Sequence, residues 1–219
     1  QPYNPTPGAF TTAPFTWAAQ MVSSWTLTIP ESGIATLTVT TTGGGVVTAT
    51  AAVTPAARDA DDHLLHSGGA SLSTGAYVAP GATTLATAAT PVAGVRSLTI
   101  TVDNNIQTQP GWGTAVLRPI PGAMPTVTGT LNVDFVTGGP FTAAFLDRTD
   151  LTLLATLSAI ENSDELVQIA IPSLRVNGGG IPQAGSPTDM QQLSVSFEAM
   201  RVADPELITV VNRTYDTTI

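Results

Sequence analysis

The chain has 219 residues, a net charge of −9 and no cysteine. The missing cysteines exclude a disulfide framework and a thiolate metal site, so the fold must rest on packing and backbone pairing. Sixteen acidic residues against seven basic ones disfavour a nucleic-acid reader that holds phosphates. Only 11% of the residues are charged, well below the roughly 25% of an ordinary soluble domain. This composition predicts a surface that is largely covered by neighbouring copies of the protein.

The N-terminal stretch "QPYNPTPGAF" has neither the charged start nor the apolar centre of a signal peptide, and it lacks an initiator Met. We therefore expect the sequence to begin inside a longer chain. Residues 32–57 carry no charge, but their Thr, Gly and turn signals make them a poor membrane span, and no membrane partner is expected. The length suits one large all-β domain or two small ones.

Apolar residues alternate with Thr along most of the chain, which is typical of strands with one buried and one solvated face. The clusters "PESG" at 30–33 and "TGGG" at 42–45 predict tight turns. The fold class expected is all-β, a β-sandwich or partly open barrel. The predicted strands are 24–29, 34–41, 46–53, 95–102, 126–136, 151–158, 165–171, 191–199 and 206–213.

Little helix is expected. The best candidate is 140–148, where Pro140 suits the first turn. Phe141 and Phe145 lie four residues apart, so they share one helix face and are expected to pack on the sandwich exterior, leaving Asp147 and Arg148 in solvent. A weaker candidate helix is 55–66.

One hairpin pattern occurs twice. The first strands match at an offset of 73 residues, and the second strands match at an offset of 94 when Leu37 is aligned with Leu131. The second copy thus holds 21 extra residues between its strands, which we interpret as an arm at 105–125. Low complexity is the alternative source of the match. The matched residues of the first strands are Val22, Trp25, Leu27 and Ile29 in one copy and Val95, Leu98, Ile100 and Val102 in the other.

The arm is too thin to have a core of its own, so its apolar side chains are expected to contact a neighbouring subunit. The alternative is an arm folded back over its own sandwich, with Trp112 as a lid. The apolar arm residues are Trp112, Val116, Leu117, Ile120 and Met124.

Catalytic constellations are sparse. The segment "RDADDHLLH" at 58–66 could bind a metal through its histidines and a carboxylate. A solvated loop or helix face is the simpler interpretation, because the sequence contains no third His and no Cys to complete a site. Asp164 and Glu165 do not define a glycosidase pair, and a serine triad would need one of the same two histidines. We expect no enzyme activity, no metal and no cofactor. The residues of the acidic segment in question are Asp59, Asp61, Asp62, His63 and His66.

Roughly from Val95 to Thr214 the chain reads, in order, "VRSLTITVDNNI", a Gly/Pro-bearing arm, "VTGTLNVDF", "PFTAAFLDRTD", "LTLLATL", "IAIPSLRV", "SVSFEAM" and "ELITVVNRT". This order of segments resembles the tail tube proteins of long-tailed bacteriophages. The segment "SSWTLTIPESG" is similar to the strand pair that precedes this unit in longer, two-part members. We expect the chain to consist of an N-terminal strand unit at 1–90 and a tail-tube-like domain at 91–219.

The resemblance implies a structural virion protein of the tail, made in the host cytoplasm. Such proteins form ring-shaped β-barrels, here of six subunits or of three if the chain is duplicated, which stack through a hairpin arm. DNA passes through the lumen without specific binding, and tape measure, terminator and baseplate proteins are the other partners. The alternative from another class is a β-sandwich binding module, of the capsid-decoration, adhesin or lectin kind.

For a DNA conduit, acidic side chains are expected to outnumber basic ones on the inner wall, because basic ones would hold phosphates. The lumen candidates are Asp103, Asp134 and Glu198. The alternative places these acids at subunit seams, paired with Arg96, Arg118 or Arg175.

Overall fold

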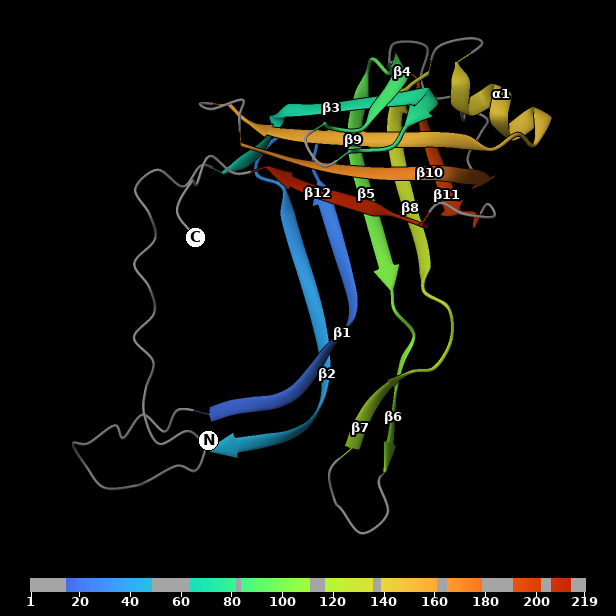
Figure 1. The fold of residues 1–219 in the computed structure, drawn as a ribbon. Helices are drawn as coiled ribbons and strands as arrows, with labels where there is room; N and C mark the ends of the chain where they lie inside the picture. The colour runs from blue at the N-terminus through green and yellow to red at the C-terminus, as the bar shows by residue number, and fades with distance from the viewer. Residues whose placement is uncertain are drawn as a thin grey trace.

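The computed structural model describes residues 15–48, 64–81, 84–110, 117–135, 139–160, 165–178, 191–201 and 206–213. The predicted all-β class is confirmed, with one short helix and a hairpin arm (Figure 1). The elements are β1 Phe15–Ile29, β2 Thr36–Thr48, β3 Leu65–Val78, β4 Thr87–Pro91, β5 Val95–Asp103, β6 Ile106–Pro110, β7 Leu117–Pro121, β8 Thr126–Asp134, α1 Pro140–Asp147, β9 Leu151–Ala159, β10 Leu166–Gly178, β11 Gln192–Ala199 and β12 Thr209–Arg213.

Ten strands form one sheet in the order β2-β1-β5-β8-β11-β10-β9-β3-β4, with β12 also paired to β10. The sheet curls, so that β1, β2, β5 and β8 run across β3, β9 and β10 (Figure 1). An isolated β-bridge between Ile34 and His66 brings the start of β3 back to the β1–β2 turn. In this bridge the Ala35 N–H donates to the Leu65 carbonyl and the Ser67 N–H to the Gly33 carbonyl, both at 2.9 Å. The result is a half-barrel with two crossing layers.

The core lies between these two layers. Alternate residues of β5, β8 and β11 point inward, as the period of two predicts. Ile100, Leu131 and Val195 are fully buried at its centre. Leu153, Leu157 and Ile171 close it from the second layer. Apolar burial of this extent is the main stabilising contribution to the fold.

The second layer is also covered on its outer face. There Leu154 packs with Ala86 and Ala170. The buried side chain of Gln168 fixes the segment before β4: its Oε1 accepts from the Ala86 N–H at 2.8 Å, and its Nε2 donates to the Ala86 carbonyl at 3.0 Å and to Thr156 Oγ1 at 3.1 Å. Both polar atoms of the buried Gln168 amide thus have hydrogen-bond partners, which avoids the free-energy cost of burying an unpaired polar group.

The helix and one turn follow the predictions. Pro140 occupies the first turn of α1, and Arg148 ends it in the left-handed conformation at φ 53°. Phe141 is buried, Phe145 is half-buried against the core, and Asp147 is exposed, as is Arg148. The segment "PESG" at 30–33 joins β1 to β2. No helix in the described ranges is long and apolar enough to cross a membrane.

Two predictions were wrong. The run Gly43–Gly45 lies inside β2, paired with β1, and is not a turn. The terminal amide of the exposed Gln20 side chain lies where a Cβ of residue 43 would be. The weaker helix at 55–66 fails at its described end, where Leu65 and His66 begin β3. Residues 55–63 lie outside the described ranges.

The two matching hairpins lie side by side. Both are antiparallel pairs, β1 with β2 and β5 with β8, and β1 pairs antiparallel with β5. Leu27 lies opposite its own counterpart Ile100, which places a local two-fold axis between them. The hairpins differ in register: Leu27 is opposite Leu37, whereas Ile100 is opposite Gly129. A duplication of the sequence, and the division at residues 90 and 91, stay predictions.

Candidate assembly surfaces

β2 forms one edge of the large sheet. Along Thr36–Thr48 no strand in the described part of the chain pairs with its outer side, and the strand contains no charged residue. Leu37 lies opposite buried Leu27 on the core-facing side of the sheet, yet Leu37 is 61% exposed and Val39 is 47% exposed. The β2 edge therefore offers unpaired backbone groups together with uncovered apolar side chains, which is the pattern of a strand that associates with another chain.

The arm is an ordered hairpin. β6 pairs with β7 from Ile106 opposite Pro121 to Pro110 opposite Leu117. Asn105 starts it in the left-handed region at φ 50°; its carbonyl accepts from the Gly122 N–H at 2.9 Å, and its side-chain Nδ2 donates to the Met124 carbonyl at 2.5 Å. The side chain of an Asn tolerates this backbone conformation well. The long hairpin arm predicted from the insert is confirmed.

The predicted arm contacts fall in different places. Trp112 and Val116 lie outside the described residues, and Leu117 is the first residue of β7. Ile120 is half-buried opposite Gln107, and Met124 is 68% exposed at the base of the arm. β7 lies against β2 and β1. The arm, the first half of β1 and the last half of β2 extend from the same side of the layered body (Figure 1).

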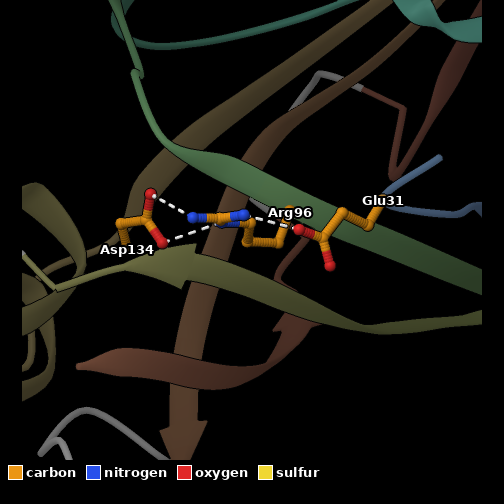
Figure 2. Close-up of polar contacts among 3 residues, drawn as sticks. All are labelled: Glu31, Arg96 and Asp134. Carbon is orange, nitrogen blue, oxygen red and sulfur yellow. Dashed lines mark hydrogen bonds and ion pairs between the residues drawn. The ribbon is translucent and has the colours of Figure 1, made fainter. Parts of the chain in front are cut away.

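At the opposite end of β5, Arg96 joins the two hairpins (Figure 2). Its Nε and Nη2 donate to the two oxygens of Asp134 at 2.8 and 3.2 Å, and its Nη1 donates to Glu31 Oε1 at 2.5 Å. The hydrogen bonds to Asp134 first, and then to Glu31, raise the pKa of the guanidinium above its usual value. The bidentate pair with Asp134 holds β5 to β8, and the single bond to Glu31 connects the β1–β2 turn to them.

The three lumen candidates lie at separate points on one face of the sheet, the face opposite the core. Asp134 at the end of β8 is bonded to Arg96. Asp103 at the other end of β5 accepts from the Asn105 N–H at 2.8 Å. Glu198 on β11 accepts from Asn177 Nδ2 at 3.2 Å.

The acidic segment provides no described metal site. Asp59, Asp61, Asp62 and His63 lie outside the described ranges, and so does Asp164. His66 belongs to β3, where its Nδ1 accepts from the Gly68 N–H at 2.9 Å. In the part of the chain that the structure describes, no three His, Cys, Asp or Glu side chains gather.

Sequence reasoning missed the β2 edge, because the alternation within 34–41 does not show which strand comes next in the sheet. A signal was present in the sequence: residues 32–57 carry no charge, although an edge strand exposed to solvent usually carries some. It also named Arg96 only as one alternative partner of the acids, since pairing between distant strands is not visible in local patterns.

A comparison with models of protein families shows to which family the chain belongs. A family model described as phage tail tube protein matches residues 1–199. No curated protein matches the chain. The matched range includes the first hairpin as well as the arm, the helix and the strands through β11. The chain therefore belongs to the phage tail tube protein family and is a structural component of the virion tail.

Proposed function

We propose that this chain is the repeating subunit of a tail tube, which assembles into rings that stack around a channel for DNA during ejection. The observation that carries the proposal is the β2 edge. β2 has thirteen residues and no charge, and no described strand pairs with its outer backbone groups. Such a strand would promote uncontrolled aggregation unless a partner covers it. Association in a closed ring gives every such edge a partner and leaves no free edge.

The apolar residues of the β2 edge support the same arrangement. Leu37 and Val39 lie on the core-facing side of the sheet, but both side chains are exposed because the described core does not extend over them. A neighbouring subunit that pairs with β2 would bury them. Burial of a Leu side chain stabilises an interface by about 1.5–3 kcal/mol, multiplied by the number of subunits in the ring.

The arm supports stacking. It extends from one side of the body, and if it contacts the opposite side of the next copy, that contact joins unlike surfaces and forms an open stack. We propose that Trp112, Val116, Leu117, Ile120 and Met124 contact the next ring. The tape measure, terminator and baseplate proteins would meet the tube in its lumen and at its ends.

The test compares two substitutions of an exposed Leu by Lys. Leu37→Lys places a charge on the β2 edge, and Leu146→Lys places one on the exposed side of α1, where Leu146 is 64% exposed. In negative-stain images and sedimentation, wild type and Leu146→Lys should form rings and tubes, with the end views giving three- or sixfold symmetry. Leu37→Lys should remain a folded, unassembled subunit. A wild-type protein that stays monomeric, as a binding module would, or tubes of Leu37→Lys, would contradict the proposal.

A further inference from the structure

The face of the β2-β1-β5-β8 sheet that points away from the core is covered with side-chain hydroxyls. Residues that pair across strands project to the same face, so their side chains form rows perpendicular to the strands. Three rows alternate with the core-facing positions of Leu27 and Ile100. The rows across β2, β1, β5 and β8 are Thr40, Ser24, Asp103 and Thr126; Thr38, Thr26, Thr101 and Thr128; and Thr36, Thr28, Thr99 and Thr130.

The described residues leave this hydroxyl face uncovered. Thr128 and Thr130 on β8 and Thr36, Thr38 and Thr40 on β2 are exposed. The central Thr side chains are half-buried by one another, and Thr26 and Thr101 share a hydrogen bond between their Oγ1 atoms at 3.1 Å. The outer face of the second layer differs, since Ala86 and neighbouring residues cover it. The hydroxyl face is thus free to meet solvent or another molecule.

Charge is confined to the margins of this face. Within its three rows on the four strands, Asp103 is the one charged residue. The middle row continues through Glu198 to Arg175, whose Nε and Nη2 both donate to Asp150, at 3.0 and 2.9 Å. Arg96 lies at the end of the sheet and bonds two carboxylates. Each of these arginines is therefore already engaged by an acid.

We infer that the hydroxyl face lines the channel, and that neutral hydroxyls, not carboxylates, make up most of the wall that meets DNA. The inference rests on the proposed function. The β2 edge belongs to this sheet, and the arm continues from its strands β5 and β8, so a ring joined through the β2 edge has this sheet as its wall. One face of the wall is packed against the second layer, which leaves the hydroxyl face for the lumen.

The chemistry of the face fits a passing duplex. DNA is retained when cationic side chains displace its counterions, and the inner rows contain no cation. Single bases are retained by stacking on aromatic rings, and the three rows contain none. Thr and Ser hydroxyls hydrogen-bond water as donors and acceptors, so the duplex would slide along a hydrated, uncharged surface. Asp103 and Glu198 add repulsion within about 8 Å, the Debye length at physiological salt.

Labelling tests the inference, because the chain contains no cysteine of its own. Thr128→Cys places a thiol on the hydroxyl face, and Leu146→Cys places a control thiol on α1. Each variant is treated with a small maleimide and with a maleimide on a dextran too large to enter a tube. In dispersed subunits both thiols should react with both reagents. In sedimented tubes Thr128→Cys should react with the small reagent only, and Leu146→Cys with both.

The outcomes separate the inference from the function on which it rests. Tubes in which Thr128→Cys still reacts with dextran would overturn the channel lining while leaving the tube intact. Failure of wild type to form tubes would overturn the proposed function and the lining with it.

A second experiment tests the role of neutral hydroxyls. Tubes of Thr128→Lys/Thr130→Lys, assembled with short duplex DNA, should retain DNA that nuclease cannot digest. Tubes of the wild type should retain none, and tubes of Ala143→Lys/Leu146→Lys should bind only digestible DNA on the outside. Lysine on the hydroxyl face that traps no protected DNA would contradict the inference.

Discussion

The two hairpins share one sequence pattern and differ in burial. In β5–β8, Ile100 and Leu131 are fully buried, whereas in β1–β2, Leu37, the sequence counterpart of Leu131, is 61% exposed. The difference arises from their places in the sheet: β8 pairs with β11 on its other side, whereas no described strand pairs with the outer side of β2. The comparison teaches that an alternating pattern fixes which face of a strand is apolar, while the neighbours decide whether that face is covered.

The connections of the two hairpins can be made alike, and this should have the largest effect. Replacing residues 104–125 by a copy of Ile29–Ala35 gives the β5–β8 pair the turn of the β1–β2 pair. Asp103 and Thr126 are directly opposite, as are Thr28 and Thr36, so the turn spans the same distance. We expect a folded subunit that forms rings but no stacks, measured by circular dichroism, sedimentation and negative-stain microscopy. Stacks of normal length would show that the arm does not join rings.

The matched leucines test the difference in burial. Leu131→Ala should lower the free energy of unfolding of the dispersed subunit by about 2–5 kcal/mol, because it opens a cavity in the core. Leu37→Ala should change it by no more than about 0.5 kcal/mol, as is usual for exposed positions. Urea unfolding of both variants measures this. Equal losses would mean that the β2 edge is buried within the single subunit.

Gly129 tests the difference in register, because it faces Ile100 as Leu37 faces Leu27. A Cβ at Gly129 would overlap the ring of Phe197 and lie 2.5 Å from the Thr99 carbonyl oxygen. Gly129→Ala should therefore cost about 1–3 kcal/mol of stability through overpacking. Adding Phe197→Leu should recover part of this loss in the same unfolding assay. A neutral Gly129→Ala would show that β8 can shift to accept a side chain.

The smallest effect is expected where Arg96 connects the hairpins. Arg96→Met removes the link from Glu31 to Asp134, and Arg175→Met removes a pair within the second half of the chain. Both pairs are partly exposed, so each variant should lower the unfolding midpoint slightly. The Arg96 effect should be the larger, because two carboxylates lose their partner, and both should shrink at about 1 M salt, where the Debye length is about 3 Å. A larger effect for Arg175→Met would remove the special role of Arg96.

The sequence predicted what depends on local patterns. Alternation identified the core of β5, β8, β9 and β11, and Pro140 with Phe141 identified α1. β3 was missed because Gly68, Gly69 and Gly75 interrupt its alternation; at Gly69 a Cβ would collide with the Ser158 carbonyl, so the close approach of β9 requires glycine there. The β2 edge was missed because exposure depends on which strand comes next in the sheet, and local patterns do not contain that order.

Gln168 has a consequence for how the surface can vary. Its amide meets the N–H and the carbonyl of Ala86 in the way that a neighbouring strand residue would, so one side chain anchors the start of the 84–91 segment by its backbone. Backbone groups are common to almost all amino acids. The path of this outer segment is therefore encoded from β10. Ala86 must stay small because it is buried, while the exposed positions Thr87, Ala89 and Thr90 are free to change. In the proposed tube, with the second layer outside the wall, these positions would vary without any change in the sheet that forms the wall.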